Sequence, residues 1–502
     1  MFLQSEHRRA FLKWQQLAKA EAEDSPLVSL DEVAACELKN AGLDLVLSHT
    51  ADEIGLTEKL RSVFGGDLSE KLLSLAFYCA AEGRSPLYRA SIWSRDQKLP
   101  GANEFTETAI SRLLTETRVD EVQTFLAEWL KTSTPDERLS LDITSVSSYG
   151  ANNEDVMHGY NCDKENLPQI NLLMVVSQKT KLPLWYEQLP GAISDSTTVI
   201  DTIKTFVQAG TASRQLVLDR GFASFSNISY LLKNRFKFTM GIPLENFTNY
   251  REYLREAYKE NKFCDPTNTL TMFDDYETAQ TQACTKLMKI DGHRVYFHMY
   301  YPDYYRTRDN EIFMNRLNEV ERKLKEGIKI TSPKEQELAE NCFVVKTTPK
   351  RGRRVTPLLD KIASFRENDS GFFAIMSNQF KSPQEALIVY KLRDGIEKRF
   401  DDLKTEADLK RLRMHSWHNQ QIRLFIQFLA EILRCRLLYR MQTDEKFPKK
   451  IKTVSDLLWE MKSLRWVKIE NHRGFYKRPT KTQRLIMDAL NIGLTPNQCP
   501  SL

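Results

Sequence analysis

The sequence is poor in the residue groupings that build thiolate metal sites and disulfide frameworks. It has eight cysteines in 502 residues, and none of them forms a C-x-x-C pair or a close group with histidine. This scatter argues against a zinc module and against a disulfide-stapled secreted domain. It is typical of a protein that stays in a reducing cytoplasm.

Long apolar runs and glycine-rich loops are also missing. The first residues, MFLQSEHRRAFLKWQQ, are charged and lack the apolar core of a signal peptide. No stretch approaches the ~18 uninterrupted apolar residues that a membrane span needs. There is no Gly-rich phosphate loop, internal repeat or low-complexity tract. We therefore expect a cytoplasmic protein without a membrane partner.

What the sequence does have is an uneven distribution of charge. Hydrophobic residues make up 41% and charged residues 28%, with a net charge of +5, which is ordinary for a globular protein. Between Tyr390 and Leu485, however, 24 Lys and Arg residues stand against 12 Asp and Glu residues. This basic C-terminal third suits a polyanionic partner, and the alternative is a solvated surface without a ligand.

The periodicity of apolar residues changes along the chain. The first 135 residues have helical spacing, whereas strand-like and helix-like segments alternate from residue 138, which predicts a mixed sheet covered by helices. A Tyr-rich run, a charged helix and short strands at 341–347 and 371–378 then interrupt this rhythm. We predict a helical N-terminal domain (1–135, a candidate for DNA binding), a first core part (136–243), an insertion (244–378), a second core part (379–441) and a basic C-terminal module (442–502).

Two acidic residues stand out by their position in predicted strands. Asp142 interrupts the apolar segment LSLDITS, and Asp219 ends the apolar segment QLVLDRGF. A carboxylate in a buried strand is costly unless it is paired, hydrogen-bonded or bound to a metal. Either residue alone is explained by a turn or a cap. The two together, followed by a third acidic residue in a polar helix, are less easily explained in that way.

That helix is the segment VYKLRDGIEKRFDDLK, residues 389–404. At about 100° per residue, four of its polar residues fall on one arc of roughly 60°, and five apolar residues fall on the adjoining arc. The pattern predicts one amphipathic helix that buries the apolar stripe and lines the edge of that stripe with polar groups. The polar residues are Tyr390, Arg393, Glu397 and Lys404, and the apolar residues are Val389, Leu392, Ile396, Phe400 and Leu403.

Three carboxylates that converge on one site repel each other unless cations compensate them. Oxygen ligands without Cys or His favour Mg²⁺ or Mn²⁺ over zinc. Two such ions about 3.5–4 Å apart stabilise both the attacking and the leaving oxygen of an in-line phosphoryl displacement, without a protein nucleophile. Asp394 and Asp401 are rival acidic residues on the helix, but they lie farther from its buried edge than Glu397.

These segments resemble a bacterial insertion-sequence transposase of the DD(E) type. The helix keeps every spacing of the Y-x2-R-x3-E-x6-K signature, the Tyr-Arg-Glu-Lys pattern of insertion-sequence family four. LSLDITS and LVLDRGF resemble the two Asp strands of that group, and LPQINLLMVVSQKTKLPLWYEQLPGAISDSTTV resembles the run between them. The resemblance covers roughly residues 70–440.

The resemblance implies an α/β fold with an RNase H-like mixed-sheet catalytic core. A β-rich insertion interrupts this core, an N-terminal helical domain precedes it and a helical C-terminal tail follows it. The implied enzyme binds terminal inverted repeats, cleaves the transposon ends and joins the 3′-hydroxyls to target DNA, as a nucleoid-associated homodimer on double-stranded DNA with two Mg²⁺ or Mn²⁺ ions. The implied metal ligands are Asp142, Asp219 and Glu397, and the implied DNA contacts are Tyr390, Arg393, Lys404 and Arg220.

One departure concerns relatives that cut through a DNA hairpin, which can stack a flipped base on a Trp in the insertion. This chain has no Trp between Trp185 and Trp417. Its candidates for stacking a base are tyrosines, namely Tyr300, Tyr301, Tyr304 and Tyr305. Two alternatives to a transposase stay open: a transposase-derived DNA-binding protein without catalysis, and a metal-dependent nuclease with the same core.

Overall fold

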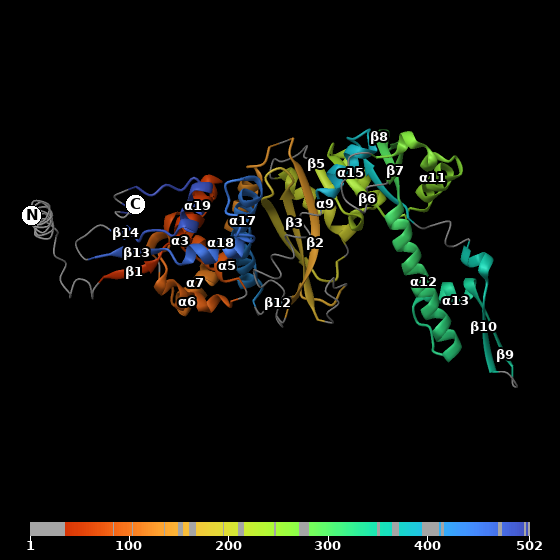
Figure 1. Ribbon diagram of the computed structural model, residues 1–502, viewed down its shortest axis with the longest axis horizontal. Helices are drawn as coiled ribbons and strands as arrows, with labels where there is room; N and C mark the ends of the chain where they lie inside the picture. The colour runs from red at the N-terminus through yellow and green to blue at the C-terminus, as the bar shows by residue number, and fades with distance from the viewer. Residues whose placement is uncertain are drawn as a thin grey trace, which may run out of the picture. The chain divides into compact units, whose positions relative to one another are not determined.

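The computed structural model describes residues 36–83, 85–102, 104–134, 136–148, 154–159, 167–193, 195–208, 215–244, 247–270, 281–348, 352–363, 371–393, 411–412, 416–469, 474–495 and 498–499. The described residues divide into two compact units, one within Met1–Leu113 and Leu437–Leu502 and the other within Leu114–Arg436 (Figure 1). No helix in these described ranges is long and apolar enough to cross a membrane.

The first unit joins two segments that are far apart in the sequence. Strand β1 pairs antiparallel with β13, and β13 pairs with β14. Helix α18 packs closely against α3, because a Cβ on Gly42 would lie only 1.9 Å from the carbonyl oxygen of Met461. The N-terminal and C-terminal segments that the periodicity separates therefore share one folded unit. Its elements are β1 (Glu37–Asn40), α3 (Gly42–Glu53), α4 (Leu56–Phe64), α5 (Gly66–Glu82), α6 (Ala90–Trp93), α18 (Val454–Lys462), β13 (Arg465–Lys468), β14 (Phe475–Tyr476), α19 (Lys481–Ala489) and the short 3₁₀ turns Leu87–Arg89, Ser94–Asp96 and Pro100–Ala102. Helix α7 (Glu107–Glu116) crosses the boundary of the unit.

The second unit is built on one mixed sheet with the strand order β4-β3-β2-β5-β6-β11-β8-β7, and β12 pairs with β2. Strand β2 is antiparallel to β3 and parallel to β5, and β5 is parallel to β6. A first strand with an antiparallel hairpin on one side and parallel strands on the other is the mixed sheet of an RNase H-like core, as expected. The core strands are β2 (Arg138–Ser148), β3 (Gln169–Ser177), β4 (Pro183–Pro190), β5 (Gln215–Leu218), β6 (Lys237–Ile242) and β12 (Arg411–Leu412).

Helices cover this sheet because its central strands are apolar on both faces. All nine residues of β3 are buried, as expected for a strand that is covered on both sides. Trp129 of α8 (Val119–Leu130) donates its indole N–H to the carbonyl oxygen of Pro183 at 2.9 Å. The apolar segment 422–441 lies in helix α17 (Trp417–Thr443), and the ring of its Phe425 meets the ring of Phe125 edge-on, with the ring centres 5.2 Å apart. Helices α9 (Asp195–Gln208) and α10 (Phe225–Lys233) lie between the parallel strands in sequence.

Strands β11, β8 and β7 of the insertion extend the core sheet, whereas β9 and β10 form a separate two-stranded sheet. Strand β11 pairs with β6 on one side and with β8 on the other, so the hairpin β7–β8 continues the same sheet. The predicted strands at 341–347 and 371–378 are confirmed as β9 and β11. Long helices accompany the strands of the insertion, and its elements are α11 (Thr248–Lys259), the 3₁₀ turns Lys262–Cys264 and Pro266–Asn268, β7 (Thr281–Ile290), β8 (His293–Pro302), α12 (Asp303–Glu326), α13 (Pro333–Cys342), β9 (Phe343–Thr348), β10 (Gly352–Pro357) and β11 (Phe373–Ser377).

The predicted single helix over 389–404 is confirmed only in its first residues. Helix α15 (Pro383–Lys391) ends there, and the N–H of Arg393 donates to the carbonyl oxygen of Tyr390 in a tighter, 3₁₀-type last turn. The predicted burial of Leu392 is wrong, because this residue is 44% exposed, whereas Arg393 is only 6% exposed. Residues 394–410 lie outside the described residues.

Candidate functional site

The site begins at Asp142, in the middle of β2. Its neighbour Leu141 is fully buried, while the Asp142 side chain keeps 14% of its surface exposed. One carboxylate oxygen, Oδ1, accepts the backbone N–H of Ile143 at 2.9 Å. A polar group in this otherwise apolar strand is therefore partly compensated by the strand's own backbone.

Asp219 lies beside Asp142 because of the strand register. Leu141 pairs with Leu218 across the parallel strands β2 and β5, and the two aspartates directly follow these two residues. Asp219 then begins the 3₁₀ turn Arg220–Phe222, and its side chain is 32% exposed. The two aspartates are 77 positions apart in the sequence, but the sheet brings them within about one strand spacing of each other.

Arg393 joins the two carboxylates. Its Nη1 lies 3.3 Å from Oδ2 of Asp142, and its Nη2 lies 3.4 Å from Oδ1 of Asp219. The guanidinium is 7% exposed, so the interactions are weakly screened by water. One positive charge lies between two negative charges, and it offsets the repulsion between the two carboxylates.

Tyr390 is a second partner of Asp219. Its hydroxyl donates to Oδ1 of Asp219 at 2.9 Å, and the guanidinium carbon of Arg393 lies 5.4 Å from the centre of its ring. Burial, and next the charge of Asp219, raise the pKa of the Tyr390 hydroxyl far above its usual value. The phenol is therefore a neutral hydrogen-bond donor, and its donation is fixed toward Asp219.

Two residues that support this arrangement were not predicted from the sequence. A Cβ on Gly241 of β6 would lie 2.4 Å from the Tyr390 hydroxyl oxygen, so the ring needs glycine here. The side-chain amide of Gln178 donates to the carbonyl oxygen of Val389 at 2.9 Å and to the hydroxyl of Ser140 at 2.8 Å. Gln178 thereby ties the end of α15 to β2. A glycine within the apolar strand KFTMGI is a signal of close backbone approach that could have found Gly241.

The other predicted site residues differ in how far the structure places them. Arg220 is exposed at the edge of the site, close enough for its charge to act on Tyr390. Glu397 and Lys404 lie outside the described residues. Tyr300 is fully buried and donates to the carbonyl oxygen of Pro383 at 2.7 Å, so it has no free face for a base.

The donor chemistry of the aspartate pair suits a hard divalent cation. Carboxylate oxygens from neighbouring strands face one buried guanidinium, so the site already accommodates positive charge between them. Among the described residues, no group of three His, Cys, Asp or Glu residues lies close enough together to hold a metal ion. The aspartates thus fit a metal site that needs a further ligand from elsewhere.

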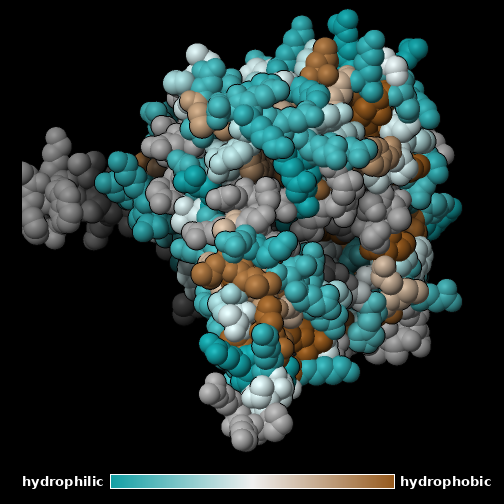
Figure 2. Space-filling view, turned by 90° about the vertical axis from the view of Figure 1, so that its right-hand side faces the viewer, coloured by the Kyte–Doolittle hydropathy of each residue, from teal (hydrophilic) through white to brown (hydrophobic). Residues whose placement is uncertain are grey.

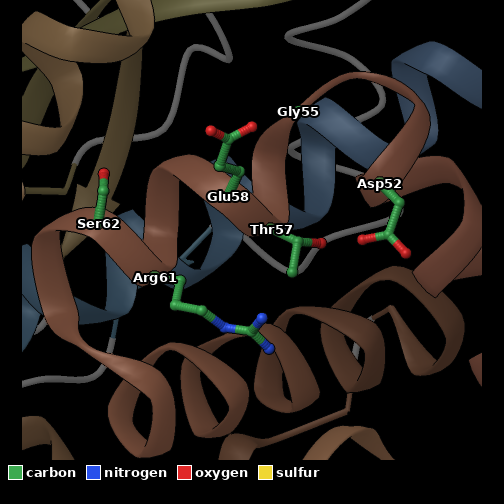
Figure 3. Close-up of a pocket in the computed structure, with 6 residues that line it drawn as sticks. All are labelled: Asp52, Gly55, Thr57, Glu58, Arg61 and Ser62. Carbon is green, nitrogen blue, oxygen red and sulfur yellow. The ribbon is translucent and has the colours of Figure 1, made fainter.

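A separate hollow lies on α4 in the first unit. It has a volume of about 440 Å³ and is lined by Asp52, Gly55, Thr57, Glu58, Arg61 and Ser62. Figure 3 shows that Arg61 extends toward a neighbouring helix while Glu58 and Ser62 point the opposite way, so the polar groups do not converge. Arg61 also pairs with Glu70 on α5 at 3.3 Å. The hollow has no arrangement for chemistry comparable to the aspartate pair.

A family match agrees with the chemistry of the pair. Residues 133–433, more than half of the chain, match the family model of the transposase DDE domain. Among solved structures, one match is the piggyBac transposase synaptic complex with hairpin DNA, determined by cryo-EM, with 11% identity and a TM-score of 0.39. That alignment covers 84% of this chain and 76% of the other chain. The comparison with curated proteins gives no match. The family match includes Asp142, Asp219, Tyr390 and Arg393, and this chain belongs to the family of transposases with a DDE domain.

Proposed function

We propose that this protein is the transposase of a bacterial insertion sequence with the Tyr-Arg-Glu-Lys signature of insertion-sequence family four. It binds the terminal inverted repeats as a homodimer on double-stranded DNA, cleaves at the transposon ends and joins the 3′-hydroxyls to target DNA. The observation that carries the proposal is the Asp142–Asp219 pair, which the register of β2 and β5 brings together and Arg393 bridges.

In this proposal Asp142, Asp219 and Glu397 are the catalytic metal ligands. Two Mg²⁺ or Mn²⁺ ions bound there would lower the pKa of an attacking water or 3′-hydroxyl and stabilise the leaving oxygen. The position of Glu397, four residues after Arg393, agrees with this role, although Glu397 itself lies outside the described residues.

The cationic and phenolic residues would position DNA and the carboxylates. Tyr390 fixes the orientation of Asp219 through its hydrogen bond. Arg393 neutralises the pair in the absence of DNA, and its planar guanidinium also suits bidentate binding of a phosphate. Arg220 is exposed at the rim and would contact the DNA backbone, as would Lys404 in the signature.

The test of this function uses three conservative variants, Asp142→Asn, Asp219→Asn and Glu397→Gln. Each keeps the size of the side chain but removes a charged metal ligand, so we expect Mg²⁺-dependent cleavage of an end duplex to fall by at least about 10³-fold. Binding of the same duplex should persist in all three variants, as a gel-shift assay would show.

Other outcomes separate the alternatives. Retained cleavage in all three variants would sink the assignment of these ligands. A wild-type protein that binds ends but never cuts them would be a transposase-derived binding protein. A protein that cuts but gives no joined product in a strand-transfer assay would be a nuclease.

A further inference from the structure

The insertion carries a small module with its own hydrophobic core. The C-terminal half of α12 packs on α13 and on the start of β9, and the first half of α12, residues 303–316, contains no buried residue. The module is therefore held together by its own contacts at the far end of a largely exposed helix. Its core residues are Leu317, Val320, Leu324, Leu338, Cys342 and Phe343, and Val355 packs against them.

The module presents an exposed two-stranded ribbon. Strands β9 and β10 pair antiparallel, and in the described residues their only ladder is with each other. Only Phe343 is buried in β9, and β10 has no buried residue. A lone hairpin is marginally stable in water, so the packing of Phe343 and Val355 on α12 and α13 explains how the ribbon persists. Figure 2 views the second unit from the side on which the ribbon lies, and hydrophilic and hydrophobic residues alternate at the surface of its projecting lower part.

The ribbon differs in its charge balance from the helices that hold it. Residues 343–362 contain six Lys and Arg residues but one acidic residue, Asp360. Near its C-terminal end, α12 has cations that are ion-paired: Arg322 pairs with Glu319 and Glu326, and Lys325 pairs with Glu321. Lys346 and Arg354 of the ribbon are exposed, and within the described part of the chain no ion pair neutralises either of them.

The register places these two cations together. Lys346 pairs with Arg354 across the ladder, so both side chains project from the same face of the ribbon. Arg353 projects from the other face and lies beside Gly327, where α12 ends and its macrodipole favours a cation. The Lys346–Arg354 pair is therefore the part of the ribbon whose charge the protein leaves uncompensated.

We propose that the β9–β10 ribbon is a DNA-binding arm that lies in a groove of the transposon-end duplex, with Lys346 and Arg354 on its phosphates. The inference rests on the proposed function, because that function supplies the DNA. The major groove, about 12 Å wide, admits a two-stranded β-ribbon. At 1.5 Å per residue, the 24 residues of α12 span about 36 Å, which equals about ten base pairs of duplex. The arm thus suits DNA about one helical turn from the cleaved end.

The experiment compares two double variants with the same loss of charge. Lys346→Gln/Arg354→Gln removes the uncompensated pair, and Arg322→Gln/Lys325→Gln removes two ion-paired cations of α12. Binding of an end duplex of about 30 base pairs is measured by fluorescence anisotropy as a function of salt. Loss of two phosphate contacts should reduce the slope of log K against log[salt] by about 1.8 and weaken binding at least about fivefold. The control should change the slope by less than about 0.5, and circular dichroism should show both variants folded.

Three results would overturn the inference. Equal slopes for the ribbon variant and the control would mean that the cations only protect the edges of the ribbon from pairing with other strands. Normal end binding with a loss of joining would place the ribbon on target DNA. Normal DNA binding with a change in sedimentation would make the ribbon a protein interface. The proposed function fails separately, if the wild type does not cut the end duplex in Mg²⁺.

Discussion

At the scale of single residues, the site depends on the close approach of Tyr390 to Gly241. Any side chain larger than a hydrogen atom at position 241 would disrupt this contact. Gly241 lies under the hydroxyl of Tyr390, and the backbone nitrogen of Arg220 is 3.2 Å from the position of a Cβ there. A methyl group would push the ring away from Asp219, since the backbone of a buried strand moves less easily than the end of a side chain.

We therefore expect Gly241→Ala to lower end cleavage by about tenfold or more, through loss of the Tyr390–Asp219 hydrogen bond. The double variant Gly241→Ala/Tyr390→Phe should lose much less activity relative to Tyr390→Phe than Gly241→Ala loses relative to the wild type, because the closest clash, with the hydroxyl, is gone and only the tight contacts of 3.0 Å to the ring and 3.2 Å to the Arg220 nitrogen remain. Additive losses in this cycle would contradict the explanation. Gly66→Ala is the matched control, because a Cβ there meets nothing within 4 Å.

The two aspartates could be predicted from the sequence, but their surroundings could not. A carboxylate within or directly after an apolar strand is visible in one dimension, as for Asp142 and Asp219. Leu392 shows the limit: an angular position on a helix does not reveal which neighbour covers each face, and here Leu392 of the apolar arc is 44% exposed while Arg393 of the polar arc is buried. No local sequence pattern marks Gln178 as a supporting residue, because its role depends on the carbonyl group of Val389, 211 residues away.

At the scale of elements, β8 is fixed to the segment after β11 by a buried histidine. The Nδ1 of His298 lies 2.9 Å from the hydroxyl of Thr285, and its Nε2 lies 3.1 Å from the carbonyl oxygen of Phe380. Since a carbonyl group only accepts, Nε2 carries the proton and Nδ1 accepts from Thr285. Burial lowers the pKa of His298 from 6.5 to about 4, against a smaller opposite effect of the Phe380 carbonyl group.

This shift predicts how stability depends on pH. The folded state binds the His298 proton less tightly than the unfolded state, so the contribution is fully present above about pH 6.5 and is lost as the pH falls to about 4. The loss should amount to about 3 kcal/mol of unfolding free energy. Urea unfolding between pH 4 and 7.5 measures it, and His298→Gln should flatten the dependence. A profile that is the same in the variant and the wild type would contradict the assignment.

At the scale of the whole molecule, the pairing of β1 with β13 joins segments more than 400 residues apart. Periodicity predicted helices in the first segment and the resemblance implied a helical tail in the second, but neither could predict that they share a unit, because strand partners are not encoded in local spacing. The strand order of the core could be predicted better, since consecutive strands with helices between them have few possible arrangements. The extension of that sheet by β11, β8 and β7 could not.

We expect Val467→Pro to destabilise the first unit by about 3 kcal/mol, because proline removes an N–H from the central strand of a three-stranded sheet. Hydrogen exchange should show protection falling in β1 and α3 as well as in β13. Val467→Thr, which keeps the strand, is the control. If only β13 and β14 lose protection, then the two segments do not fold as one unit.

The parts of the aspartate site are added to the chain at very different times during synthesis. Asp142 and Asp219 emerge from the ribosome early, but Arg393 and Tyr390 follow only after the whole insertion has been made. A chain that is released prematurely within the insertion thus lacks the guanidinium that balances its two carboxylates, and it lacks Glu397, the third ligand in the proposed function. If the proposed function holds, we expect incomplete products of translation to be unable to cut DNA.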